Sequence, residues 1–284
     1  MDSSTTRRDL LYKSAALAAV AFAFFSVIMS AQAGTGLNAV HRLHSSVSVS
    51  KPPYLVFLPL GTGIAPAKVL QDCEYIDSLP IDGVVMKSRT VVAGNETVPY
   101  CIWSNIESVT YAEVFDEVAP LKAKFSKLNH SWLMGLTTLK AGDWFDDWSI
   151  CLHNFSTVAR ACKDLGMEGM LFDNSNNQWN PVPIWVHKPL ASNKTREQYL
   201  QQVRLRGKQI MEACVKEYPA FKLALMCGPS LSEKGDPGSV QDPSYDFLSG
   251  FYSGLLAGAG ENGMVIDASG FYDVRERESF EGSI

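Results

Sequence analysis

The chain has 284 residues, of which 46% are apolar and 19% charged, a composition typical of globular proteins. Its formal net charge of −5 comes without a long basic run, and this argues against nucleic acid as a partner. The six cysteines form no CxxC or Cys/His pair at metal-ligand spacing. We therefore expect buried free thiols, with disulfides as the alternative in an exported protein.

The N-terminal segment has the pattern of an export signal. Arg7 and Arg8 precede an apolar run over residues 14–29, and an Ala-Gln-Ala cleavage site ends at residue 33. Because paired arginines are typical of twin-arginine signals, we predict a signal peptide over residues 1–33 and an exported protein, periplasmic or extracellular. We expect no membrane association after cleavage. The alternative is an uncleaved membrane anchor.

Apolar runs and helical patterns alternate along the rest of the chain. Short apolar runs predict strands over residues 54–60, 81–87, 132–137, 221–227 and 263–267, and one more that ends at Asp173. Helical spacing and helix-boundary residues predict helices over residues 66–75, 111–128, 149–165, 196–218 and 245–257. Two β-branched runs around Gly94-Asn95 predict a hairpin over residues 90–100.

This alternation predicts an α/β fold with a parallel sheet built from right-handed βαβ units. We favour a (β/α)8 TIM barrel, truncated after about six βα units, over an open doubly wound sheet. The first strand–helix turn has no G-x-G-x-x-G or P-loop spacing, so a nucleotide-binding sheet has no support. We expect one domain over residues 54–284, preceded by a linker or lead-in at residues 34–53.

Two predicted strands end in an acid. Asp173 ends the fourth strand and Asp267 ends the sixth. In a barrel, side chains at these positions point into the catalytic mouth. Glycosidic hydrolysis uses such a pair, because one carboxyl protonates the leaving oxygen while the other attacks or activates water. The alternative is that each acid accepts hydrogen bonds from the backbone of the loop that follows it.

Aromatic and amide side chains accompany these acids. Trp144 and Trp179 lie in loops on the same predicted rim, where aromatic planes suit the apolar faces of sugar rings. Asn174 and Asn176 follow the fourth strand, and their amides match sugar hydroxyls. The alternatives are tryptophan packing beneath long loops and ordinary loop chemistry for the amides. We predict a carbohydrate ligand or substrate, no cofactor and no metal, with the oligomeric state left open.

The loop before residue 149 contains three more acids. Asp143, Asp146 and Asp147 lack the spacing of an EF-hand, and a helix is predicted directly after them. We therefore expect Asp146 or Asp147 to cap that helix. On the helix over residues 196–218, Arg204 and Arg206 face different ways, and we expect one of them to reach a loop acid.

An ordered series of segments covers the middle and C-terminal halves of the chain after the signal. The segments are residues 143–147, Asn154, 165–173, 199–207, 217–219 and 263–267. The series resembles a group of exported bacterial proteins with a glycosidase-like TIM barrel. This resemblance implies action on carbohydrate, with a general acid at the end of the fourth strand and a nucleophile at the seventh.

Two positions depart from the pattern of that group. Its members tend to carry a glutamate two residues after the fourth-strand acid, where this chain has Ser175. They also tend to carry a glutamate three residues after the sixth-strand acid, where this chain has Gly270. A serine hydroxyl cannot replace a carboxyl of raised pKa as general acid.

Three interpretations follow from these observations. The first is an exported glycoside hydrolase-like protein that acts on carbohydrate through its strand-end carboxylates. The second is a non-catalytic carbohydrate-binding pseudo-enzyme on the same scaffold. The third is an incomplete gene product.

Overall fold

A computed structural model describes part of the chain. It covers residues 21–24, 54–57, 63–87, 90–93, 96–99, 101–103, 108–137, 143–174, 194–227 and 247–268. Most of the predicted signal peptide and all of the predicted linker lie outside these residues. So do Ser175, Asn176, Trp179 and Gly270, for which the sequence predictions stand as made.

The predicted parallel sheet is confirmed. Its parallel strands are β2 (Tyr54–Phe57), β3 (Gly83–Lys87), β7 (Trp132–Thr137), β8 (Gly169–Asp173), β9 (Lys222–Leu225) and β10 (Met264–Asp267). They pair side by side in chain order. A doubly wound sheet reverses its strand order at one point, which brings helices to both faces. The described strands show no such reversal, so the doubly wound alternative does not apply to them.

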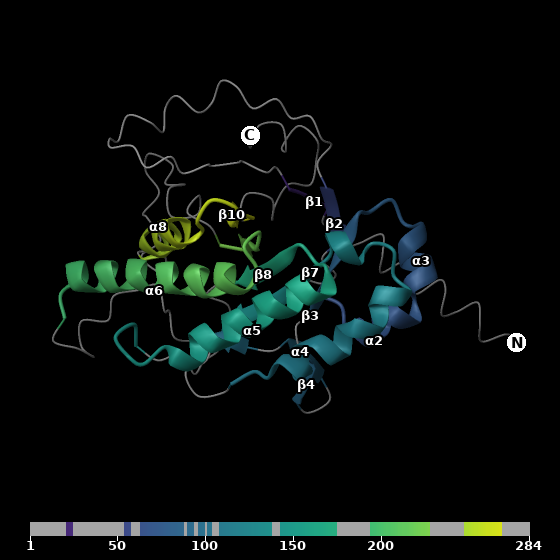
Figure 1. The fold of residues 1–284 in the computed structure, drawn as a ribbon, viewed down its shortest axis with the longest axis horizontal. Helices are drawn as coiled ribbons and strands as arrows, with labels where there is room; N and C mark the ends of the chain where they lie inside the picture. The colour runs from purple at the N-terminus through teal and green to yellow at the C-terminus, as the bar shows by residue number, and fades with distance from the viewer. Residues whose placement is uncertain are drawn as a thin grey trace, which may run out of the picture.

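Helices follow one another along one side of this sheet (Figure 1). They are α2 (Pro66–Gln71), α3 (Cys73–Ser78), α4 (Tyr111–Val118), α5 (Ser149–Leu165), α6 (Arg196–Glu217) and α8 (Leu248–Gly258). Right-handed crossovers between strands in unreversed order place every helix on the same face. Of the helices described, none is both long enough and apolar enough to cross a bilayer.

Sequence signals fix the ends of the longer helices. Thr110 and Thr195 each form a capping box at the start of α4 and α6, in which the threonine hydroxyl accepts from a backbone N–H one turn ahead. Gly166 ends α5 with a φ of 74°, a left-handed conformation that glycine adopts without strain. The predicted α5 is confirmed over its full length.

Two predicted helices are shorter than expected. The helix predicted over residues 66–75 is broken at Asp72 into α2 and α3. The helix predicted to reach residue 128 ends at Val118, and the 3-10 helices Ala119–Ala123 and Leu128–His130 follow it. Pro120 explains the early end, because proline has no N–H to continue the hydrogen bonding of α4.

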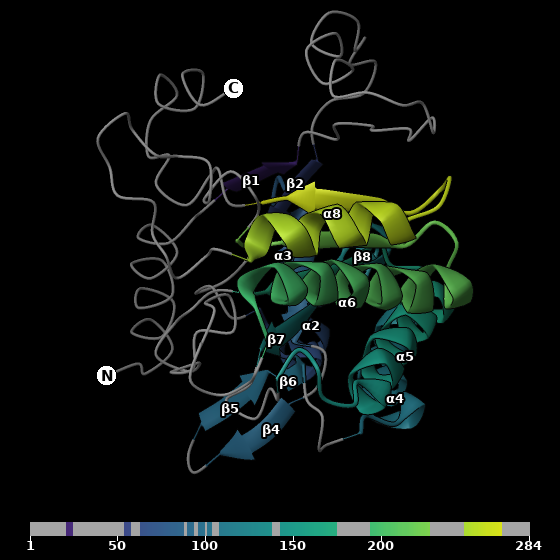
Figure 2. The same cartoon turned by 90° about the vertical axis from the view of Figure 1, so that its left-hand side faces the viewer.

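Shorter strands flank the main sheet. The predicted hairpin is confirmed as β4 (Thr90–Ala93) paired with β5 (Glu96–Pro99), and Figure 2 shows it beside β6 (Cys101–Trp103). The sequence did not predict β6, which pairs with β7 beyond the point where β3 ends. Strand β1 (Ala21–Phe24), inside the apolar run of the predicted signal, pairs antiparallel with β2.

Side chains alternate between the two faces of the sheet. Met86, Leu133 and Phe172 pack into the large cluster formed with the helices. The opposite face, which we call the inner face, carries Val56, Val85, Trp132, Met134, Leu171, Ala224, Met226 and Ala268. These side chains are also buried. Burial on both faces explains why the strands read as continuous apolar runs in the sequence.

Helices α6 and α8 approach closely. A Cβ atom at Gly254 of α8 would lie 2.1 Å from the carbonyl oxygen of Arg204 on α6. Likewise, a Cβ atom at Gly207 of α6 would lie 2.4 Å from the carbonyl oxygen of Phe251. Only glycine permits this backbone approach, so the glycines of α8 serve helix packing.

Candidate functional site

Asp173 lies at the carboxyl edge of the sheet, on the inner face. It is the last residue of β8, pairs with Leu136 of β7, and follows Leu171 by two positions. Leu136 and Leu171 both belong to the inner-face packing, so alternation along the strand directs Asp173 the same way. Its side chain is 7% exposed. Asp173 thus ends its strand, as the sequence predicted.

Lys87 is a second charged residue at this edge, and the sequence prediction missed it. It ends β3 two residues after Val85, an inner-face residue, and pairs with Met134 of β7. Its backbone N–H donates to the carbonyl of Ile64 at 3.0 Å, which fixes the strand end. The residue is 9% exposed, and burial lowers the pKa of its ammonium. A lysine that directly ends an apolar run was the available signal, although the run does not show which face of the sheet it joins.

Asn174 has a structural role in place of the predicted ligand contact. Its Nδ2 donates to the carbonyl oxygen of Cys227 at 2.7 Å, and its Oδ1 accepts from the N–H of Cys227 at 2.8 Å. Both groups are buried. The side-chain amide thereby joins the chain beyond β8 to the chain beyond β9, in the manner of a ladder hydrogen-bond pair. This pair fixes the backbone directly after Asp173.

Asp267 lies on the opposite face from Asp173. It pairs with Leu225 and follows Val265 by two positions, and both of these residues pack into the helix-side cluster. Burial, and then the charge of Asp267, raise the pKa of Tyr252 on α8 to about 12. Because successive residues of a strand point to opposite faces, the structure does not bring the two predicted carboxylates together.

Trp144 is a core residue, which corrects its prediction as a sugar-stacking side chain. It is 5% exposed. Its ring stacks on Trp148 with centroids 5.1 Å apart and forms a T-shaped contact with Trp103 with centroids 5.5 Å apart. Phe251 of α8 lies against it at 6.0 Å. A sugar cannot reach a ring face that other aromatic side chains already cover.

The acidic loop before α5 is held by its neighbours. Arg206 on α6 donates from Nε to the carbonyl of Trp144 at 3.1 Å and from Nη2 to the carbonyl of Asp146 at 2.6 Å. Asp147 accepts from the backbone N–H of Ser149 at 2.9 Å, and this hydrogen bond lowers its pKa. The N-cap position of α5 is Trp148, which makes no side-chain capping hydrogen bond, so neither Asp146 nor Asp147 is the N-cap that the sequence predicted. Asp147 contacts the first residue of the helix from one position earlier, and Arg206 reaches the loop as expected.

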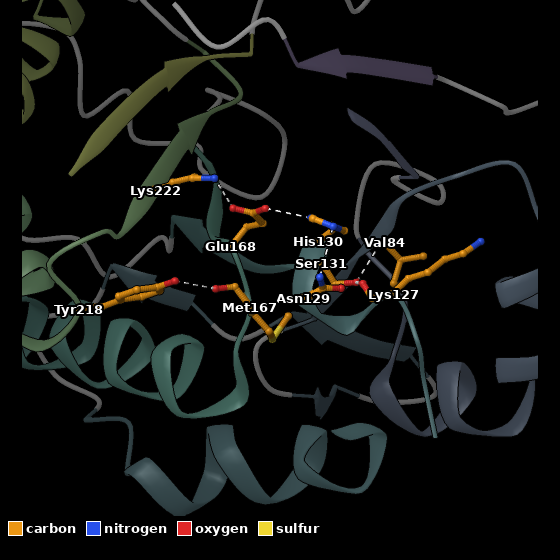
Figure 3. A network of polar contacts seen from close by, with 9 residues as sticks. All are labelled: Val84, Lys127, Asn129, His130, Ser131, Met167, Glu168, Tyr218 and Lys222. Carbon is orange, nitrogen blue, oxygen red and sulfur yellow. Dashed lines mark hydrogen bonds and ion pairs between the residues drawn. The ribbon is translucent and has the colours of Figure 1, made fainter. Parts of the chain in front are cut away.

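A network of polar contacts occupies the amino edge of the sheet (Figure 3). Glu168, just before β8, lies 3.1 Å from Nδ1 of His130 and forms an ion pair with Lys222 of β9. The Ser131 hydroxyl accepts from the N–H of Val84 at 3.2 Å. These contacts join the starts of β3, β7, β8 and β9. The network therefore ties together the amino ends of four neighbouring strands.

The cysteines that the structure describes are free thiols, as predicted. Cys151, Cys162, Cys214 and Cys227 are buried and Cys73 is partly buried. Burial raises the pKa of Cys162 and of Cys214. Buried thiols of raised pKa are poor nucleophiles, so they belong to the core.

Neither a metal-binding cluster within the described residues nor a similar known protein was found. Within the described ranges, no three or more His, Cys, Asp or Glu side chains gather in a way that would hold a metal ion. Comparison with protein-family models, curated proteins and solved structures gave no match to this chain. The burial and the strand positions of Asp173 and Lys87 make the carboxyl edge of the inner face the candidate site.

Proposed function

We propose that this is an exported protein of (β/α)8 type that binds a carbohydrate at the carboxyl edge of its inner face, where Asp173 contacts the ligand. The observation that carries this proposal is the burial of Asp173 on the inner face, at the end of the fourth parallel strand. Unreversed strand order and helices on one side support the barrel architecture. The signal pattern at residues 1–33 supports export.

The chemistry of this edge suits a sugar. Asp173 offers acceptors and Lys87 offers donors to hydroxyl groups, and the buried apolar side chains of Leu171 and Met226 lie on the same inner face. Such a mixture of apolar lining and few polar groups is typical of small-molecule sites. Asn176 and Trp179, which follow Asp173 in the chain, are proposed as further sugar contacts.

Binding is favoured over hydrolysis by the position of Asp267. Glycosidases of both stereochemical classes need two carboxyl groups that flank the scissile bond. Asp267 packs on the helix side and cannot flank a bond with Asp173. Hydrolysis is the second candidate function, because Asp173 holds the fourth-strand position at which barrel glycosidases commonly place the general acid.

A glycan panel tests the proposal. Each sugar is titrated by calorimetry into the wild type, Asp173→Asn and the matched control Asp267→Asn, and released reducing ends are measured in parallel. We expect binding by the wild type and the control, and affinity lower by about tenfold or more in Asp173→Asn, because a charge-assisted hydrogen bond is lost.

The outcomes separate the two candidates. Product release that disappears in Asp173→Asn would establish the hydrolase. No binding by any sugar, or equal affinity in the wild type and Asp173→Asn, would contradict the proposed carbohydrate site.

A further inference from the structure

The carboxyl edge of the inner face brings together a buried amine and a buried carboxyl. Lys87 ends β3 and Asp173 ends β8, and β7 is the strand between them. Lys87 is level with Met134 and Leu171, so Asp173 lies two residues further along and two strands away. At normal strand spacing this is a Cα–Cα distance of roughly 12 Å. Both residues lie on the inner face at the same edge of the sheet.

Three features distinguish Lys87 from an ordinary surface lysine. It is buried, whereas Lys68 and Lys208 are exposed. Its backbone is fixed by Ile64 on one side and by Met134 on the other. Burial lowers the pKa of its ammonium, which increases the fraction of neutral, nucleophilic amine. Desolvated lysines of this kind act as nucleophiles toward carbonyl carbons.

We propose that Lys87 is a carbonyl-reactive residue, which forms a reversible imine with a small open-chain aldehyde or ketone while Asp173 relays the protons. The open form of a reducing sugar belongs to this chemical class. The inference uses the same edge as the proposed carbohydrate site, but it does not require that a cyclic sugar binds there.

The reaction balances without a further reactant. The neutral Nζ of Lys87 attacks the carbonyl carbon, a C–N bond forms, and the π electrons move to the oxygen. Asp173 accepts a proton from the nitrogen and returns it to that oxygen, which gives a carbinolamine. Asp173 then transfers a second proton from the nitrogen to the oxygen, while the C–O bond breaks. The products are the imine and one water molecule, and water reverses the reaction.

The competing explanation is that Lys87 serves only as a structural ammonium. A buried ammonium requires compensation by polar groups, and such a lysine would stay protonated and unreactive. The two explanations differ in the rate at which Nζ reacts with a carbonyl compound, and this rate can be measured residue by residue.

Reductive trapping tests the proposal. The full chain is incubated with millimolar glycolaldehyde and sodium cyanoborohydride at neutral pH, and peptide mass spectrometry follows the labelling of each lysine. We expect saturable labelling of Lys87 at an initial rate at least about tenfold above that of Lys68 and Lys208, the exposed controls in the same molecule. Asp173→Asn is expected to slow labelling of Lys87 by about a hundredfold, and Lys87→Arg to remove it.

The outcomes test the reactivity of Lys87, the relay by Asp173 and the carbohydrate site separately. Labelling of wild-type Lys87 no faster than that of Lys68 and Lys208 would overturn the proposal, and this comparison needs no variant to fold. Fast labelling of Lys87 that Asp173→Asn leaves unchanged would overturn the relay. A negative glycan panel with fast labelling of Lys87 would defeat the carbohydrate proposal alone.

Discussion

The two edges of the parallel sheet carry charged side chains in different surroundings. At the amino edge, Glu168 contacts His130 and Lys222, and all three residues are partly exposed. At the carboxyl edge, Asp173 and Lys87 are 7% and 9% exposed and point to the inner face. The amino edge keeps its charges near water and pairs them across strand starts, whereas the carboxyl edge removes its charges from water.

This difference indicates what each edge is for. A partly exposed ion pair contributes modest stability and costs less desolvation than a buried one. A buried charge costs far more, and apolar replacements often stabilise a protein. Buried charged groups with a shifted pKa, such as Lys87, are typical of functional sites. The following changes test this contrast, from the largest expected effect to the smallest.

Replacement of Trp144 by alanine should be the most destabilising change. Its buried ring packs against Trp103, Trp148 and Phe251, so Trp144→Ala leaves a large cavity. We expect a loss of about 4 kcal/mol in the free energy of unfolding, measured by urea denaturation. A loss below about 1 kcal/mol would show that the ring lies at the surface, as a sugar-stacking role requires.

Asn174→Ala should destabilise the carboxyl edge strongly. It removes both hydrogen bonds to the backbone of Cys227 and leaves a buried N–H and a buried carbonyl without this partner. We expect a loss of about 3 kcal/mol in urea denaturation. If Asn174 instead binds a ligand, the variant will have the same free energy of unfolding as the wild type and will lose only ligand affinity.

Glu168→Ala should have a smaller effect at the amino edge. The variant removes the contacts to His130 and Lys222, which are partly screened by water. We expect a loss of about 1–2 kcal/mol in the free energy of unfolding, with ligand affinity unchanged. Glu212→Ala is the matched control, because it breaks an exposed ion pair with Lys208 at 3.5 Å and should cost less than about 0.5 kcal/mol. Equal losses in both variants would contradict a structural role for Glu168.

Lys87→Met should stabilise the protein slightly, by about 1 kcal/mol at pH 7. Burial lowers the folded-state pKa of Lys87 below its ordinary value of 10.5, so the folded state resists protonation. Burial of the Lys87 ammonium therefore destabilises the wild type fully below the folded-state pKa, and this destabilisation fades as the pH rises toward 10.5. Thermal denaturation at pH 7 and pH 10 should show the gain from Lys87→Met shrinking at the higher pH. A gain that grows with pH would contradict the buried amine.

The sequence predicted the elements whose boundaries are set locally. Strand β7 and helix α5 were predicted over their full lengths, because an apolar run defines the first and Gly166 ends the second. The three-residue strand β6 was missed, since its length is too short for any periodicity. That omission also explains the error at Trp144, because Trp103 of β6 is one of the rings that buries it.

The candidate site was predictable only in part. Asp173 and Asp267 look alike in sequence, since each ends an apolar run. They differ in which face their strand register assigns to them, and a shift of one residue reverses the face. Register depends on pairing with Leu136 and Leu225 in neighbouring strands, which no local pattern specifies. Lys87 was missed for the same reason.

The central claim is that ligands bind at the carboxyl edge of the inner face. Hydrogen–deuterium exchange, with and without the tightest-binding sugar of the panel, tests it most directly. We predict that the sugar slows exchange in peptides containing the ends of β3 and β8, at Lys87 and Asp173, and leaves the peptide around Glu168 unchanged. Protection around Glu168 without protection at the strand ends would contradict the claim.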